Sequence, residues 1–263
     1  MPTTDVGATR VNWRRGGAGD SVVLLHGLGG DIGFWDAELP ALERDFDVIA
    51  LDLRGSGATP SSAGGHEISD LADDVVAVLD DAGVARAHVV GFSMGGLVAQ
   101  ALALRHPGRL NRLVLASTYA TMGHQARLFL DAVLDVYENG ATATQMFELI
   151  CPWLFSPAFV QDPANRAFFE LPEGAADDQS MEDWRALYRA QRNFDVTEEL
   201  SRISAPTLVV SGARDALVPA ADALALRDGI AGARLEVFAE SGHLVNVEDP
   251  ARFIGSIRDF LRA

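Results

Sequence analysis

The sequence predicts an α/β fold in which a mostly parallel sheet is flanked by helices and interrupted by a helical cap insertion. Short apolar runs recur along the chain, amphipathic stretches separate them, and this alternation stops between about residues 119 and 197. The 263 residues are enough for one such domain with an insertion. We therefore expect a core domain formed by residues 1–118 and 198–263, with the insertion at 119–197.

Six apolar runs have the length and composition of buried strands. Because helices cover both faces of a parallel sheet, its strands are apolar throughout rather than alternating. The six predicted strands are 21–25 (SVVLL), 46–51 (FDVIAL), 87–91 (AHVVG), 112–116 (RLVLA), 206–211 (PTLVVS) and 234–238 (RLEVF).

Three helices of the core domain have recognisable ends. The first has an apolar face from Ile68 to Ala82 and stops at Gly83, a residue suited to a left-handed cap. The second runs over 94–105, ahead of a proline at position 107. The last begins at Pro250, which favours a first helical turn.

The insertion is rich in bulky aromatic residues. Most of them are expected to pack the insertion against the core domain, while some cover the active site, because substrate pockets form at such interfaces. The predicted substrate-binding residues are Trp35, Trp153, Phe155, Phe159 and Leu217. Packing is an equally good interpretation of Trp35.

Composition excludes several classes of function. The formal charge of −16 disfavours binding to nucleic acid or anionic membranes. All 21 basic residues are arginine, so phosphate-binding P-loops and Schiff-base enzymes, which need a lysine amine, are excluded. The single cysteine, Cys151, rules out an internal disulfide and argues against a cysteine-built metal site. With no apolar run of membrane length and no signal-like N-terminus, a cytoplasmic protein without cofactor or metal is expected.

The segment Gly91-Phe92-Ser93-Met94-Gly95-Gly96 lies between a predicted strand and a predicted helix. Glycines on either side of a serine allow a sharp strand-to-helix turn that exposes the hydroxyl at a helix N-terminus. Ser93 is therefore the candidate nucleophile. Similar turns also occur for packing or phosphate binding, but the spacing is not G-x-G-x-x-G.

A serine hydroxyl needs a base, and the chain has six histidines. His243 follows the strand 234–238 and precedes the last helix, which places it at the carboxyl edge of the sheet, where catalytic groups of α/β proteins gather. By contrast, His88 and His106 have structural or solvated interpretations, and His66 lies in a polar segment without an evident partner. We predict that His243 is the base.

The acid that orients this histidine must also follow a strand. Asp215 comes shortly after the strand 206–211, and the order Ser, Asp, His is the one that this architecture produces. The competing carboxylates are Asp52, interpreted as a loop-ordering residue, Glu240, and Glu248. We interpret Glu248, with the aspartate that follows it, as a cap of the last helix.

Two backbone amides are expected to stabilise the oxyanion of a tetrahedral intermediate. The turn His26-Gly27-Leu28-Gly29-Gly30 follows the first apolar strand at the right edge of the sheet. The predicted donors are the N–H groups of Leu28 and Met94. We expect His26 to brace this loop rather than to take part in catalysis.

Together these motifs resemble the α/β-hydrolase superfamily. The phrase HGLGGDIGFWDAELPALERDFDVIALDLRGSGAT, the turn GFSMGGLVAQALALRHPGRL and the ending SGHLVNVEDPARF are similar to the bacterial branch of 3-oxoadipate enol-lactonases and small carboxylesterases. The segment 153–159 is also similar to the lactonases. The resemblance implies cofactor-free hydrolysis of a small-molecule ester or lactone. Two features differ from parts of this family. Ser93 distinguishes the chain from relatives that use an aspartate as nucleophile. The short N-terminus predicts an abbreviated leading hairpin around Arg10 to Arg15.

The predicted reaction is ester or lactone hydrolysis through an acyl-enzyme intermediate. The same residues could serve an acyltransferase, a perhydrolase or a carbon–carbon hydrolase, or a ligand-sensing signalling protein with slow residual hydrolysis. A cofactor-dependent oxidoreductase is a more distant alternative. The insertion also holds arginines that could admit anionic substrates, although most are interpreted as solvated helix faces: Arg127, Arg185, Arg189 and Arg192. The natural substrate and the oligomeric state stay open.

Overall fold

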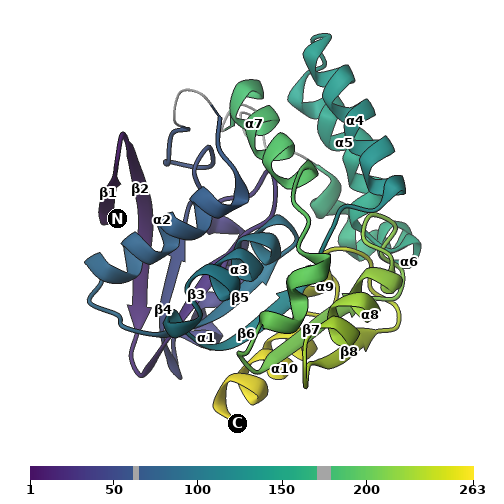
Figure 1. Ribbon diagram of the computed structural model, residues 1–263. Coiled ribbons are helices and arrows are strands. Elements are labelled where there is room, and N and C mark those ends of the chain that lie inside the picture. The colour runs from purple at the N-terminus through teal and green to yellow at the C-terminus, as the bar shows by residue number, and fades with distance from the viewer. Residues whose placement is uncertain (62–64, 171–178) are drawn as a thin grey trace.

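The computed structural model describes residues 1–61, 65–170 and 179–263. Within these residues, eight strands form one sheet in the order β1-β2-β4-β3-β5-β6-β7-β8 (Figure 1). Strand β2 is antiparallel to both β1 and β4, and the remaining neighbours are parallel. The strands are β1 Thr3–Val6, β2 Thr9–Gly17, β3 Asp20–Leu25, β4 Phe46–Leu51, β5 Ala87–Phe92, β6 Leu110–Ala116, β7 Thr207–Gly212 and β8 Arg234–Phe238.

All six predicted strands are present, as β3 to β8, and each end lies within two residues of its predicted position. Strands β1 and β2 form the leading part of the sheet. Strand β2 has nine residues, but β1 has four and pairs only with Thr9 to Asn12, so a leading hairpin of four residue pairs is present. A left-handed Gly7 makes the tight turn, and the Trp13 indole donates a hydrogen bond of 2.9 Å to Thr4 Oγ1 across the hairpin.

Helices cover both faces of the sheet. Those predicted from Ile68, Met94 and Pro250 are present as α2, α3 and α10, and Gly83 after α2 has the expected positive φ. The helices are α1 Leu39–Leu42, α2 Ile68–Asp81, α3 Met94–Arg105, α4 His124–Glu138, α5 Ala143–Leu154, α6 Pro157–Gln161, α7 Met181–Arg192, α8 Ala220–Gly229, α9 Val245–Glu248 and α10 Pro250–Arg262. Short 3-10 helices are η1 Ile32–Trp35, η2 Pro107–Arg109, η3 Pro163–Phe169 and η5 Thr197–Arg202.

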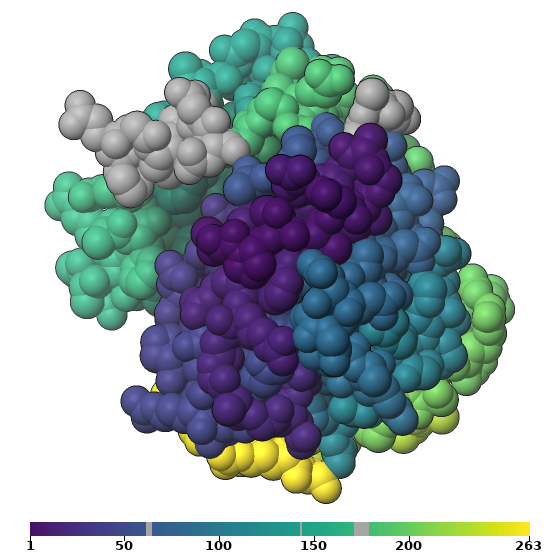
Figure 2. Space-filling view, turned by 90° about the vertical axis from the view of Figure 1, so that its left-hand side faces the viewer, coloured from purple at the N-terminus to yellow at the C-terminus, as the bar shows by residue number. Residues whose placement is uncertain are grey.

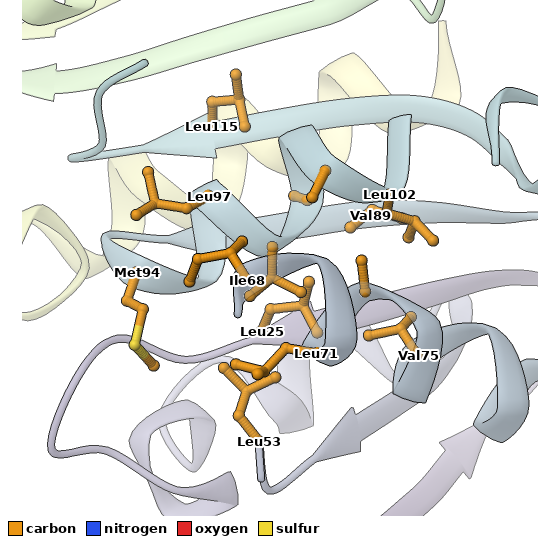
Figure 3. Packing of buried hydrophobic residues seen from close by; sticks show 14 of the residues in the cluster. Leu25, Leu53, Ile68, Leu71, Val75, Val89, Met94, Leu97, Leu102 and Leu115 are labelled. Atoms are coloured by element: carbon orange, nitrogen blue, oxygen red, sulfur yellow. The ribbon is translucent and has the colours of Figure 1, made fainter. Parts of the chain in front are cut away.

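The core consists of two hydrophobic clusters, one on each face of the sheet. Successive strand residues point to opposite faces, so Val89 of β5 packs in one cluster and Val90 in the other. Figure 3 shows part of the first cluster, in which side chains of α2 and α3, among them Ile68 and Leu97, pack with Leu25 of β3. This packing fixes the start of α3, where Ser93 lies.

The segment between β6 and β7 contains α4, α5, α6 and α7, and no strand is found in its described part. In Figure 1 these helices lie together at one end of the sheet, and Figure 2 shows the same teal-to-green segment above and beside the purple N-terminal strands. We call α4–α7 the helical insertion. Among the described helices, none combines the length and the apolar character needed to cross a bilayer.

Candidate active site

Ser93 occupies the sharp turn between β5 and α3. Its backbone has φ 52° and ψ −117°, a conformation that a non-glycine residue adopts only when its surroundings impose it. Strand and helix approach so closely here that a Cβ on Gly91 would collide with the backbone of Gly95, and one on Gly95 would collide with the carbonyl oxygen of Leu25. A Cβ on Gly96 would likewise overlap a neighbouring side chain. The glycines of the motif are therefore required by the packing of the turn.

Three side chains from distant parts of the chain form a row of hydrogen bonds. Ser93 Oγ lies 3.1 Å from His243 Nε2, and His243 Nδ1 lies 2.7 Å from Asp215 Oδ2. An ionised carboxylate can only accept, so Nδ1 carries the proton and Nε2 is left to accept from the serine hydroxyl. The other carboxylate oxygen, Asp215 Oδ1, accepts from the backbone N–H groups of Leu217 (2.9 Å) and Val218 (2.8 Å).

Strand ends hold the carboxylate and the imidazole in place. Asp215 follows β7 and His243 follows β8, and the two connections touch, since a Cβ on Gly212 would collide with the carbonyl oxygen of Gly242. The hydroxyl of Ser117, which follows β6, donates a hydrogen bond of 2.7 Å to the carbonyl oxygen of His243. The carboxyl edge of the sheet thus brings the three side chains together, as the sequence predicted from strand order.

The row is shielded from water. His243 is 2% exposed, and the ring of Phe92 lies edge-on against the imidazole at a centroid distance of 5.2 Å. A second carboxyl group, that of Asp222, lies near Asp215, and burial together with this negative neighbour raises the pKa of Asp222 to about 6. Low exposure strengthens the electrostatic interaction between imidazole and carboxylate.

The two predicted oxyanion donors lie on segments that flank Ser93. Met94 is the first residue of α3, so its N–H has no acceptor within the helix. The loop that carries Leu28 passes close by, because a Cβ on Gly27 would lie 3.2 Å from Ser93 Cβ. Leu28 itself lines the cavity next to the serine. The segments that carry the two predicted donors therefore both lie next to Ser93.

His26 braces this loop, as predicted. Its Nε2 accepts from the N–H of Leu53 (3.0 Å), its Nδ1 lies 2.8 Å from the carbonyl oxygen of Gly27, and burial lowers its pKa. Asp52 orders the neighbouring loop by accepting from the N–H groups of Ile32 and Ala58.

A cavity of about 230 Å³ opens above Ser93. Its wall is mostly apolar and comes from both parts of the chain. Helices α4–α7 supply Ala126, Leu130, Ile150, Leu154, Trp184 and Gln191, and the lining residues outside these helices are Gly27, Leu28, Gly29, Gly30, Phe34, Phe92, Ser93, Tyr119, Leu217, Val218, His243 and Leu244.

Of the five predicted substrate-binding residues, Leu217 lines this cavity and the four aromatic residues do not. Trp35 is 1% exposed and packs in the second core cluster. Trp153 stacks on a phenylalanine of α4 at 4.1 Å, and Phe155 stacks on Phe159 at 5.0 Å. Trp153, Phe155 and Phe159 thus pack within the insertion itself. Packing was the alternative to substrate binding that the sequence left open for such aromatic residues.

The insertion contributes cavity residues that sequence reasoning missed: Leu130, Ile150, Trp184 and Gln191. Each lies on an amphipathic helix, whose hydrophobic periodicity distinguishes buried from exposed positions. The periodicity does not distinguish a buried residue of the core from one that lines a cavity. Arg127, Arg185, Arg189 and Arg192 are absent from the described lining, and Arg192 pairs with Asp131 of α4.

Glu248 links the histidine loop to the insertion. Its Oε1 accepts from the N–H of Gly242 (2.9 Å) and from the N–H of Ser156 (3.0 Å). The N–H of Leu244 also donates to the carbonyl oxygen of Leu154 (3.0 Å). The aspartate that follows Glu248 caps α10 as predicted, but Glu248 does not, because its side chain is directed to these two amides.

Replacing Glu248 by alanine is expected to lower kcat roughly 10- to 100-fold, because two buried amides lose their acceptor and the imidazole loses its fixed position. Glu248→Gln keeps an acceptor oxygen and should retain most of the activity. The two variants are compared by steady-state hydrolysis, with circular dichroism as a check of folding. Equal activity of the alanine and glutamine variants would show that this link does not position the histidine.

Behind the histidine loop lies a buried carboxyl group. Glu38 is 1% exposed, and its Oε1 accepts from Asn246 Nδ2 at 3.3 Å, while Glu38 Oε2 and Asn246 Oδ1 have no partner among the described residues. Burial raises the pKa of Glu38 to about 7. The pKa of Glu38 is therefore higher in the folded than in the unfolded protein, and ionisation of this carboxyl group destabilises the folded state. The destabilisation is absent below the unfolded-state pKa, grows as the pH rises from there to about 7, and is complete above it.

Glu38→Gln is therefore expected to stabilise the protein by about 2 to 4 kcal/mol at pH 8.5 and by much less at pH 5. Denaturant unfolding at the two pH values measures the difference. The matched control is Glu148→Gln, which removes an exposed carboxylate and should change the free energy of unfolding little at either pH. A stabilisation by Glu38→Gln that is the same at both pH values would contradict the interpretation.

Comparison with known proteins agrees with the geometry. Residues 22–255 match the model of the alpha/beta hydrolase family. The chain is 37% identical over 247 residues to RutD of Variovorax paradoxus, which is named for carbamate hydrolysis, with 92% of each chain covered. It is 32% identical to 3-oxoadipate enol-lactonase 2 of Acinetobacter baylyi, covering 89% of this chain and 85% of that one. The crystal structure of the enol-lactonase from Burkholderia xenovorans LB400 superposes with a TM-score of 0.89 at 28% identity, with 100% of both chains covered. The chain belongs to the alpha/beta hydrolase family.

Proposed function

We propose that this protein is a cofactor-independent serine hydrolase that cleaves a carboxylic ester or lactone. The observation that carries the proposal is the hydrogen-bonded row of Ser93, His243 and Asp215 at the floor of a cavity. A hydroxyl is a weak nucleophile until a base removes its proton, and the imidazole lies at the distance that this transfer needs. We also propose that residues 119–197 act as a cap on a core domain of residues 1–118 and 198–263.

In the first half of the reaction, Ser93 Oγ attacks the substrate carbonyl carbon while its proton passes to His243 Nε2. The carbonyl oxygen becomes an oxyanion that accepts hydrogen bonds from the amides of Leu28 and Met94. Asp215 stabilises the imidazolium that forms. When the tetrahedral intermediate collapses, the bond to the alcohol oxygen breaks, His243 protonates that oxygen, and the acyl group stays on the serine.

In the second half, a water molecule takes the place of the alcohol. His243 removes one of its protons, the resulting hydroxide attacks the acyl carbon, and the ester bond to Ser93 breaks. The serine recovers its proton from His243, and the carboxylic acid leaves. No step needs a cofactor, and every proton that is removed returns to a product or to the enzyme.

The similarity to RutD supports carbamates as a second class of substrate. A carbamate has a carbonyl carbon between oxygen and nitrogen, so the same attack would form an acyl-enzyme. Esters and lactones remain the first choice, since one enol-lactonase matches this chain in sequence and another matches it in structure.

Turnover of a graded panel of esters, lactones and carbamates tests the proposal, with mass spectrometry of quenched samples to detect an acyl group on Ser93. An esterase is expected to turn over many substrate molecules and to form the acyl adduct on Ser93 as an intermediate. A single stoichiometric burst would instead favour the ligand-sensing alternative. No turnover and no adduct with any member of the panel would refute the proposal.

A further inference from the structure

The cavity above Ser93 offers little charge to a substrate. No described lining residue is an arginine, an aspartate or a glutamate. Apart from Ser93, His243 and the indole of Trp184, the polar side chains of the wall are Tyr119 and Gln191. Recognition of a substrate in this cavity therefore depends on apolar contact and on these two neutral groups.

Tyr119 and Gln191 are almost completely enclosed, at 5% and 3% exposed. Among the described residues, no hydrogen-bond partner is found for the phenolic hydroxyl of Tyr119 or for the side-chain amide of Gln191. Neither group is among the fully buried polar atoms without a partner, and both residues line the cavity. An enclosed amide or hydroxyl without a partner costs about 1 to 3 kcal/mol, which a ligand with a matching group recovers.

Both groups can donate a hydrogen bond. Burial and the nearby carboxyl group of Asp222 raise the pKa of Tyr119, so the phenol stays protonated. The carboxylate of Asp215 lies near Asp222, which adds negative charge behind the cavity wall. Arg127 also acts electrostatically on Tyr119, but it is not among the described lining residues. A substrate carboxylate placed here would be desolvated beside these acidic groups with no arginine on the described wall to pair it, which is unfavourable.

We propose, building on the hydrolase function above, that Tyr119 and Gln191 select an uncharged acyl group that carries a hydrogen-bond acceptor, and that the cavity rejects anionic acyl groups. The volume of about 230 Å³ limits this group to a compact one. Selection acts on the acyl side because the acyl group occupies the cavity in both halves of the reaction, whereas the alcohol leaves after the first.

Three 4-nitrophenyl esters of similar length test the proposal: the pentanoate, which is apolar, the 4-oxopentanoate, which has a neutral acceptor, and the butanedioate half-ester, which is anionic. After division by their rates of alkaline hydrolysis, kcat/KM should be roughly 10-fold higher for the oxo ester than for the pentanoate, and lowest for the half-ester. Equal values for all three, or a preference for the half-ester, would overturn the proposal.

Gln191→Leu and Tyr119→Phe each remove a donor at nearly constant volume. Each is expected to lower the ratio of the oxo ester to the pentanoate roughly 3- to 10-fold. The matched control is Gln161→Leu, the same exchange at an exposed position of α6 away from the cavity lining, which should leave the ratio as in the wild type. An unchanged ratio in both cavity variants would refute the assigned role.

Binding separates this proposal from the proposed function. Calorimetry with the Ser93→Ala variant should give the tightest binding for the oxo ester and the weakest for the half-ester. If the wild type turns over none of the esters while this order of binding is found, the hydrolase function fails and the recognition stands. If turnover occurs and neither binding nor kcat/KM follows the order, the recognition fails and the hydrolase function stands.

Discussion

Replacing Ser93 by alanine is expected to lower kcat for 4-nitrophenyl pentanoate by a factor of roughly 10³ to 10⁶. The hydroxyl is the only group that the proposed mechanism uses as a nucleophile, so its loss leaves water attack assisted by the remaining amides and imidazole. Alanine fits the site, because the strain at this turn lies in the backbone and the Cβ is retained. Binding of the ester should change little.

The matched control is Ser211→Ala, which removes another buried serine hydroxyl, at the end of β7, where its contact is a long one of 3.5 Å to the carbonyl oxygen of Gly212. It should keep activity within a few-fold of the wild type. Both variants are followed by initial rates and by thermal unfolding. A Ser93→Ala variant that is folded and as active as the control would mean that another residue performs the chemistry.

The sequence allowed the central part of this site to be predicted because local rules determine it. A serine between glycines at a strand-to-helix junction is typical of an exposed nucleophile, and the register of parallel strands brings the residues that follow β7 and β8 to the same edge of the sheet. Asp215 and His243 were identified from their position after a strand and their order along the chain. Their meeting with Ser93 is a consequence of topology, which the alternation of apolar runs already indicates.

The wall of the cavity could not be predicted in the same way. Tyr119 follows β6 and Gln191 lies on the amphipathic helix α7, and both are chemically ordinary residues. Their place on the cavity wall comes from how α4–α7 pack over the end of the sheet. Trp153 and Phe155 stood out by size, yet large aromatic side chains are used first to build the insertion. Only the three-dimensional packing separates these two uses of an apolar face.

The roles of Glu38 and Glu248 show a related limit. Both lie beside helix ends, where a carboxylate is usually interpreted as a cap. In the structure, Glu248 instead accepts a hydrogen bond from the backbone amide of Ser156, 92 residues away, and Glu38 lies 208 residues from its partner Asn246. Hydrogen bonds over such separations depend on the tertiary arrangement, for which no local pattern exists.

Asp215→Asn is expected to lower kcat by a factor of about 10⁴ while leaving the fold intact. The structure gives a specific reason. Oδ1 of Asp215 accepts from the N–H groups of Leu217 and Val218, so the asparagine must place its oxygen there and its NH₂ group towards His243 Nδ1. Nδ1 then has to accept, the proton moves to Nε2, and the imidazole can no longer take the proton of Ser93.

The control for this change is Asp222→Asn, which removes a neighbouring carboxyl group but leaves Asp215 in place as the acceptor of the hydrogen bond that His243 Nδ1 donates. Its activity should stay within about fivefold of the wild type, since charge near the site changes but the tautomer does not. The pH dependence of kcat/KM for both variants separates the two effects. If Asp215→Asn and Asp222→Asn lower kcat equally, the carboxylate acts only through its charge; if only the first is inactive, the direction of its hydrogen bond to the imidazole is what catalysis requires.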